Sequence, residues 1–176
     1  METRGIEFRT LTLQDALDLA ILIEEEAQQR YAWFTHEVGG RYPGDAADMF
    51  RLMSGAEAKH AARLIERRRE LFKDAPRRIS IEDLDEVEAP DRGAPRVFMS
   101  AQQAMQVALE AEEKAYDFYD GALKQVGDPE VQTLFEELRE EELHHQHMVR
   151  ERMEQLPPGP DLESDEADEP GTDPGN

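Results

Sequence analysis

The chain of 176 residues contains no cysteine. This absence excludes disulfides, Cys-ligated zinc, iron–sulfur clusters and a rubredoxin-type iron site, and it is typical of a cytoplasmic protein. Basic residues are few: 20 Lys and Arg stand against 41 Asp and Glu, for a formal net charge of −21. A surface of this sign repels phosphate backbones, so we expect no nucleic-acid partner.

Long apolar runs are also lacking. None approaches the roughly 18 residues that a membrane span needs, so no membrane partner is expected. The N-terminal stretch METRGIEF has no apolar core of a secretory signal, which again favours a cytoplasmic location.

Capping residues and helix breakers divide the chain into four long helical stretches. With their caps these cover about residues 12–38, 45–73, 100–127 and 128–156, bounded by Gly39-Gly40, Pro76, Gly127 and Pro157-Pro158. Short links join the first two helices and the last two, so each pair is expected to form an antiparallel hairpin. The link over 74–99 is long enough to run the length of a bundle. We therefore predict an all-α fold, a four-helix bundle with a long crossover between the second and third helices.

Composition changes at the end of this bundle. Residues 157–176 hold five Pro, three Gly and seven acids, and no base. We expect one domain over 1–156 and a disordered acidic tail over 157–176.

Apolar residues at helical spacing predict one buried face on each helix. On the second helix this face comprises Met49, Phe50, Met53, Leu64 and Leu71. The link is expected to pack on the bundle through Ile79, Ile81, Leu84, Val87, Val97 and Phe98. The first helix has further apolar residues outside its stripe, Leu19, Leu22, Ile23 and Trp33. They predict a two-fold homodimer, unless the link covers them within one chain.

The two halves of the chain repeat one another around polar residues. Ala20-Ile21-x-x-Glu24-x-x-Ala27-x-x-x-Tyr31 matches Ala108-Leu109-x-x-Glu112-x-x-Ala115-x-x-x-Tyr119. Phe50-x-x-Met53-x-x-x-Glu57-x-x-His60-x-x-x-Leu64 matches Phe135-x-x-Leu138-x-x-x-Glu142-x-x-His145-x-x-x-Val149. One helical hairpin is thus used twice, and every helix has a carboxylate in the middle of its apolar face.

These interruptions indicate a metal site. Isolated ionised carboxylates are very unfavourable in a core, so buried charges are paired or bound to metal. No Lys or Arg lies on the central faces to neutralise them. Each Glu-x-x-His pair places both side chains on one helical face, and two such pairs with one Glu from each other helix form a di-iron or di-manganese carboxylate arrangement. The predicted ligands are Glu24, Glu57, His60, Glu112, Glu142 and His145.

Other polar residues are interpreted differently. His36, His144 and His147 are expected on the surface, and the Glu141/His144 pair would lie on the back of its helix. Tyr31 and Tyr119 lie two turns after a ligand and can donate to a carboxylate or carry redox equivalents. Plain core packing with a satisfied hydroxyl explains them equally well.

At these residues the chain resembles the rubrerythrin-like branch of the ferritin-like superfamily, over about residues 11–156. The resemblance implies a non-haem di-iron centre, with two Fe ions per chain (Mn or a mixed pair being alternatives). In the centre that the resemblance implies, Glu57 and Glu142 bridge the two ions. Glu24 and His60 complete the coordination of one ion, and Glu112 and His145 complete that of the other.

Two departures from the family pattern have consequences. Rubrerythrin proper carries a rubredoxin domain with four Cys, where this sequence has an acidic tail, so an external electron donor is implied. It also has a further Glu at the place of Ala115, so the ligand switch associated with that Glu is not expected.

Three functions are compatible with such a centre. The first is an oxidoreductase that reduces peroxide or dioxygen in protection against oxidative stress. The second is ferritin-like oxidation of ferrous iron, with storage or transfer of the product. The third, metals that only hold the bundle together, is disfavoured because an apolar core is often as stable as buried polar groups. The sequence favours the first.

Overall fold

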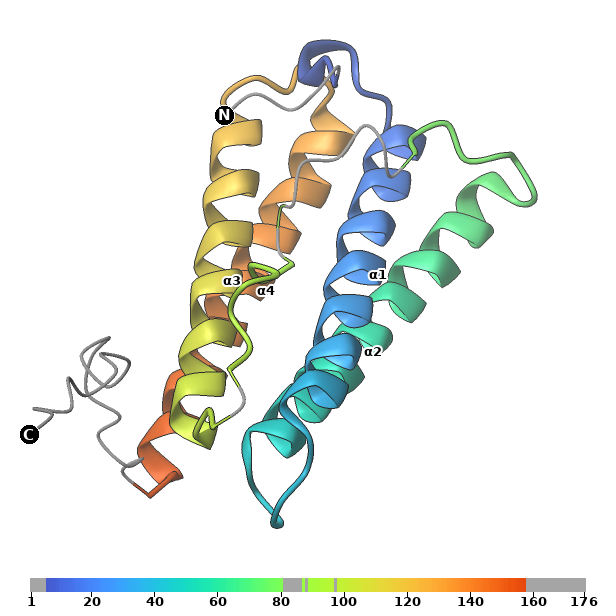
Figure 1. The fold of residues 1–176 in the computed structure, drawn as a ribbon. Coiled ribbons are helices and arrows are strands. Elements are labelled where there is room, and N and C mark those ends of the chain that lie inside the picture. The colour runs from blue at the N-terminus through green and yellow to red at the C-terminus, as the bar shows by residue number, and fades with distance from the viewer. Residues whose placement is uncertain (1–5, 81–86, 88, 97, 158–176) are drawn as a thin grey trace, which may run out of the picture.

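The computed structural model describes residues 6–80, 87, 89–96 and 98–157. It contains four long helices, α1 (Leu13–Val38), α2 (Ala46–Phe72), α3 (Ala101–Leu123) and α4 (Pro129–Gln155), and the 3-10 helix η1 (Phe8–Thr10) precedes them (Figure 1). The described ranges contain no strand. The predicted all-α fold with four helices is therefore confirmed. The predicted tail over 157–176 lies outside the described residues except for Pro157.

The helix starts agree with the predicted caps. Thr12 and Ser100 each form a capping box, with Asp15 and Gln103 as the respective partners. Asp45 accepts a hydrogen bond from the Asp48 amide. At the start of α4, the Asp128 carboxylate accepts from the amides of Glu130 and Val131, and Pro129 occupies the first turn. These bonds satisfy amides that would otherwise have no partner within the helix.

The third helix ends earlier than the sequence predicts. It stops at Leu123, not near Gly127, and the amides of Gln125 and Val126 both donate to the carbonyl of Ala122. The turn places Val126 in the core at 6 % exposure. The shorter helix thus still buries the apolar side chain of Val126, which is favourable.

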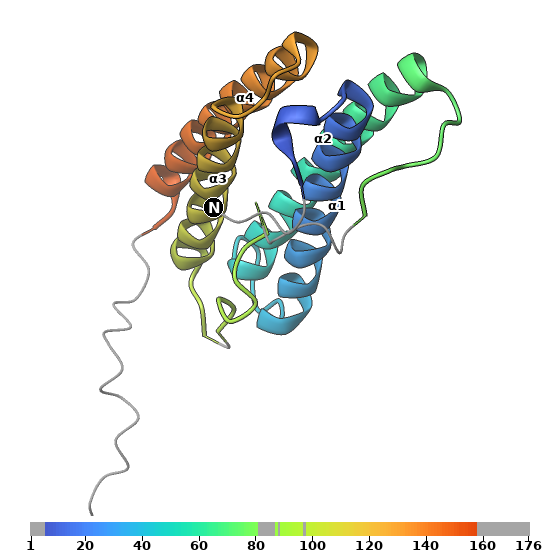
Figure 2. The same ribbon diagram turned by 90° about the horizontal axis from the view of Figure 1, so that it is seen from above.

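The helices form two antiparallel hairpins, α1 with α2 and α3 with α4, which face each other as two layers (Figure 2). The crossover leaves the upper end of α2 and reaches the lower start of α3 (Figure 1). Its described residues are attached to both helices. Arg30 of α1 donates to the Pro90 carbonyl at 2.6 Å, and Lys114 of α3 donates to the Ala89 carbonyl at 3.0 Å. None of the described helices is long and apolar enough to cross a membrane.

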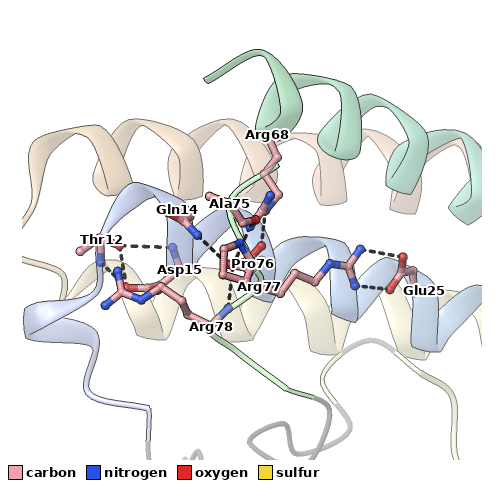
Figure 3. Close-up of polar contacts among 10 residues, drawn as sticks. Thr12, Gln14, Asp15, Glu25, Arg68, Ala75, Pro76, Arg77 and Arg78 are labelled. Carbon is pink, nitrogen blue, oxygen red and sulfur yellow. Dashed lines mark hydrogen bonds and ion pairs between the residues drawn. The ribbon is translucent and has the colours of Figure 1, made fainter. Parts of the chain in front are cut away.

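The first residues of the crossover are held to α1 by hydrogen bonds and ion pairs (Figure 3). Fully buried Asp18 pairs with Arg68 of α2, and Arg68 also donates to the Ala75 carbonyl at 2.9 Å. The Arg78 amide donates to Asp18 at 3.1 Å, and the Arg77 guanidinium forms two bonds to Glu25, of 2.8 and 3.0 Å. A buried charge is tolerated here because it is both paired and hydrogen-bonded.

The core consists of two hydrophobic clusters, one toward each end of the bundle. The upper cluster includes Phe8, Leu17, Phe118 and Phe135, and the lower includes Phe34, Phe50, Met105 and Val149. Along each helix the predicted metal ligands fall between the residues of one cluster and those of the other. The bundle therefore places a polar layer between two apolar ends.

Three sequence expectations about burial are wrong. Leu71 is 53 % exposed and Phe98 is 71 % exposed, so neither packs in the core. Leu19, Leu22 and Ile23 are buried within the chain, so these three residues cannot form the predicted dimer face, and the homodimer itself remains a prediction. Ile79 and Val87 of the link belong to or pack against the same cluster as Leu19, which fits the intrachain alternative.

Three other apolar residues predicted for the link, Ile81, Leu84 and Val97, are outside the described residues. Trp33 is 42 % exposed, so it alone of the four predicted dimer residues remains on the surface.

Candidate metal centre

Six polar side chains meet in the middle of the bundle, and they are the six predicted from the sequence. The first group joins Glu24 of α1 with Glu57 and His60 of α2. The second group joins Glu112 of α3 with Glu142 and His145 of α4. In each group one ligand atom per residue lies within 4.8 Å of the others. Each hairpin therefore supplies one complete Glu, Glu, His set.

The first group is compact. His60 Nδ1 lies 3.5 Å from Glu24 Oε2 and 3.3 Å from Glu57 Oε2. Glu57 and His60 are three residues apart, so one turn of α2 brings both to the same face. The two carboxylates are at most 2 % exposed, whereas His60 keeps 13 % of its side chain exposed. His60 thus lies at the outer side of its group.

The second group repeats this geometry. His145 Nδ1 lies 3.2 Å from Glu112 Oε2 and 3.5 Å from Glu142 Oε2. Gln146 is buried beside it and donates to the Glu112 carbonyl at 3.3 Å, which attaches α4 to α3 at the site. The sequence analysis missed Gln146, because an amide next to His145 gives no metal-ligand signal.

The two histidines join the groups. Their rings are parallel, with an interplanar angle of 3° and centroids 4.3 Å apart. Corresponding residues of the two hairpins therefore meet face to face, as the internal repeat in the sequence predicts. The predicted bridging role of Glu57 and Glu142 remains a prediction.

The side chains present fit a pair of metal ions. Glu57 Oε1 and Glu112 Oε1 are buried and have no hydrogen-bond partner among the described atoms. Glu24 Oε2, Glu57 Oε2 and Glu142 Oε2 have only the long contacts of 3.3–3.5 Å to the histidines. Buried polar atoms are almost always paired, so a set of such atoms at one place indicates a missing partner. Two ligands at about 2.1 Å from one ion are about 3.0–3.5 Å apart, which matches the His–Glu separations. Imidazole and carboxylate donors suit Fe and Mn.

Protons compete with metal for these side chains. Burial, with the nearby Glu57 charge, raises the pKa of Glu24 to about 7, although His60 opposes the shift. Burial and Glu112 likewise raise the pKa of Glu142 well above its ordinary value. Burial alone would lower the pKa of each histidine, but carboxylate contacts raise the pKa of His60 to about 9 and that of His145 to about 11. Without metal, each group therefore retains protons near neutral pH.

The tyrosines lie in different parts of the core. Tyr31 belongs to the lower cluster and stacks with Phe50, with ring centroids 6.2 Å apart. Tyr119 belongs to the upper cluster, and its ring centroid lies 5.5 Å from that of Phe135. Both are fully buried, and their roles remain predictions. His36, His144 and His147 are exposed, as expected.

Comparison with known proteins supplies the family. A family model described as rubrerythrin matches residues 15–153, and a second match covers residues 103–174. The search of curated proteins found no match.

Two solved structures share the fold. An uncharacterised conserved protein of Magnetospirillum magnetotacticum MS-1 is 25% identical with a TM-score of 0.63, covering 83% of this chain and 96% of its own. A hypothetical protein of Pyrococcus furiosus is 20% identical with a TM-score of 0.52, covering 81% of this chain and 89% of its own. The family match spans both hairpins and all six candidate ligands, and the chain belongs to the rubrerythrin family.

Proposed function

We propose that this protein is a cytoplasmic non-haem di-iron oxidoreductase that reduces peroxide or dioxygen and so protects against oxidative stress. The observation that supports it most is the pair of buried Glu, Glu, His groups joined by the stacked His60 and His145 rings. Iron bound in these groups would supply two electrons, one from each ion, and Mn or a mixed pair is the alternative.

The chain itself provides metal binding and exclusion of water. Four carboxylates and two imidazoles bind the ions, and the two hydrophobic clusters exclude water from both sides of the polar layer. Carboxylates that bind metal are deprotonated, so the protons that peroxide reduction consumes must reach the site from solvent.

Electrons must come from outside the bundle, because the sequence has no cysteine for a redox relay. The net charge of −21 suits a basic or flavin-containing reductase that docks electrostatically. Turnover with such a donor should slow as ionic strength rises, because salt screens surface attraction.

Ferritin-like oxidation of ferrous iron is the second candidate. A cavity of about 190 Å³ reaches His60 and is lined by Glu137 and Glu141, which attract cations, although Arg67 and Arg63 pair with them. This function would lead to storage or transfer of the oxidised iron.

Iron stoichiometry separates the two functions. The protein is given excess ferrous iron and dioxygen, and the iron oxidised per chain is counted. The oxidoreductase proposal predicts that oxidation faster than the protein-free background stops at about two ions per chain, and that catalysis resumes only with an electron donor. Tens of ions per chain in a soluble particle would establish iron storage in its place. Glu57→Ala serves as the variant with a disrupted site.

A further inference from the structure

An apolar cavity of about 110 Å³ opens onto both metal groups. Its inner end is formed by candidate ligands from α2, α3 and α4: Glu57, His60, Glu112 and His145. Its walls include Leu52, Met53, Ala56, Met105 and Met148. Leu52 and Met148 are also solvent-exposed, by 53 % and 44 %, so the cavity is accessible from the surface between α2 and α4.

The cavity is larger than the smallest oxidants require. A cavity of about 10–15 Å³ already holds one water molecule, and hydrogen peroxide and dioxygen have only two heavy atoms each. Apart from the candidate ligands, the one charged residue in its lining is Arg152. Thioether and alkyl walls offer hydrogen peroxide few hydrogen-bond partners, and burial of unpaired polar groups is unfavourable. The walls suit an alkyl group.

The second cavity provides a contrast. It also reaches His60, but its walls carry the Arg63–Glu141 and Arg67–Glu137 ion pairs. It does not touch Glu112 or His145, whereas the apolar cavity touches ligands of both groups. A molecule in the apolar cavity can therefore approach both metal groups at once.

We propose that this cavity binds the alkyl group of a small organic hydroperoxide, with the peroxide end directed at the metal groups. This rests on the proposed peroxide-reducing function and names its substrate class. In the reaction the O–O bond breaks, and the hydroperoxide takes up two electrons and two protons to give an alcohol and water. Ferrous ions held by the two Glu, Glu, His groups would supply the two electrons, and the external donor would reduce the ions again.

Binding can be tested without any reaction. The full chain, loaded with redox-inert zinc and labelled with ¹³C at its methionine methyls, is titrated with tert-butanol, the alcohol product of tert-butyl hydroperoxide. Saturable shifts are expected at Met53, Met105 and Met148. Met49, Met99 and Met153 do not line the cavity and serve as internal controls. No shift, or equal shifts at all six, would overturn the proposal. The same holds if xenon shifts the three methyls but tert-butanol does not, because the cavity would then be too small for the alkyl group.

Substrate preference is tested by filling the cavity. Burying one CH₂ group changes affinity by about fourfold, and a tert-butyl group carries three methyls. Ala56→Leu should therefore raise the KM for tert-butyl hydroperoxide at least tenfold relative to the KM for hydrogen peroxide. Ala58→Leu is the matched control, because Ala58 is similarly half-buried on α2 but does not line the cavity. It should change the ratio less than twofold, and equal ratios in the two variants would contradict the proposal.

Failure of the substrate assignment and failure of the proposed function give different results. If iron-loaded wild-type protein reduces neither peroxide, the proposed function is wrong, and the hydroperoxide assignment with it. If hydrogen peroxide is reduced while tert-butanol shifts no methionine methyl, the proposed function stands and the substrate class is wrong.

Discussion

The metal-free protein should gain stability as the pH falls from 8 to 5. Glu24 is 2 % exposed and lies close to Glu57, so two carboxylates share one buried site when no metal ion is present. Its pKa rises from 4.5 to about 7 in the folded protein, because burial penalises the charged form. Between these pH values the folded state keeps a proton that the unfolded state has released. The free energy of unfolding therefore increases as the pH falls through this window.

The size of the effect follows from the shift. Linkage over pH 8 to 5 gives about 2–3 kcal/mol for Glu24 alone, or roughly 5–10 °C in Tm for a chain of this size. Glu142 acts in the same direction. The histidines act in the same direction. The stability that each protonated histidine contributes is complete below about pH 6.5, and it is lost as the pH rises through about 9 for His60 and about 11 for His145.

Chemical denaturation of chelator-treated protein at several pH values measures this dependence. Glu24→Gln should flatten it by about 2–3 kcal/mol and should be more stable than wild type at pH 8. Glu37→Gln, exposed on the same helix, controls for the general effect of reducing the net charge. Metal-loaded protein should show the reverse trend, because protons then compete with metal for the ligands. Equal pH slopes in metal-free wild type and Glu24→Gln would refute the reasoning.

Three further predictions concern the site and its scaffold. Glu142→Ala should lose bound metal in elemental analysis, whereas Glu141→Ala, one residue away and outside both groups, should keep two ions per chain. Arg68→Met should cost about 3–5 kcal/mol in denaturant melts, because it leaves the buried Asp18 charge without its ion-pair partner; adding Asp18→Asn should recover part of this loss. Leu22→Glu should lower thermal stability without changing the sedimentation coefficient of the folded fraction, since Leu22 is buried within the chain, and a stable monomer formed from a dimer would contradict this.

Local sequence signals predict most of the fold. The capping residues Thr12, Asp45, Ser100 and Asp128 fix helix starts through hydrogen bonds within a few residues, so their effect does not depend on tertiary structure. The six candidate ligands could be found because burying a carboxylate is costly and the pattern occurs twice. Carboxylates buried on every helix would be unfavourable without a partner, so their repetition indicates a metal centre.

Features that depend on distant contacts could not be predicted. Asp18 resembles an ordinary surface acid in the sequence, and its partner Arg68 lies 50 residues away on another helix. Phe98 is apolar but lies on the surface beside Arg41, with the guanidinium 4.7 Å from the ring centroid. Burial of Leu19 and Ile23 became evident only with the path of the crossover. The apolar cavity likewise combines residues of three helices, which no single pattern in the sequence reveals.

The central claim is that six residues from two hairpins form one two-metal centre that reduces peroxide. Its most direct test starts from metal-free protein loaded anaerobically with ferrous iron, which is then mixed with one equivalent of hydrogen peroxide, or of dioxygen, per chain in a stopped-flow instrument. Two ferrous ions per chain should be oxidised in one rapid phase, and the reaction should then stop until an electron donor is added. Iron oxidised no faster than free ferrous ion, or an unchanged rapid phase in Glu142→Ala, would contradict the central claim.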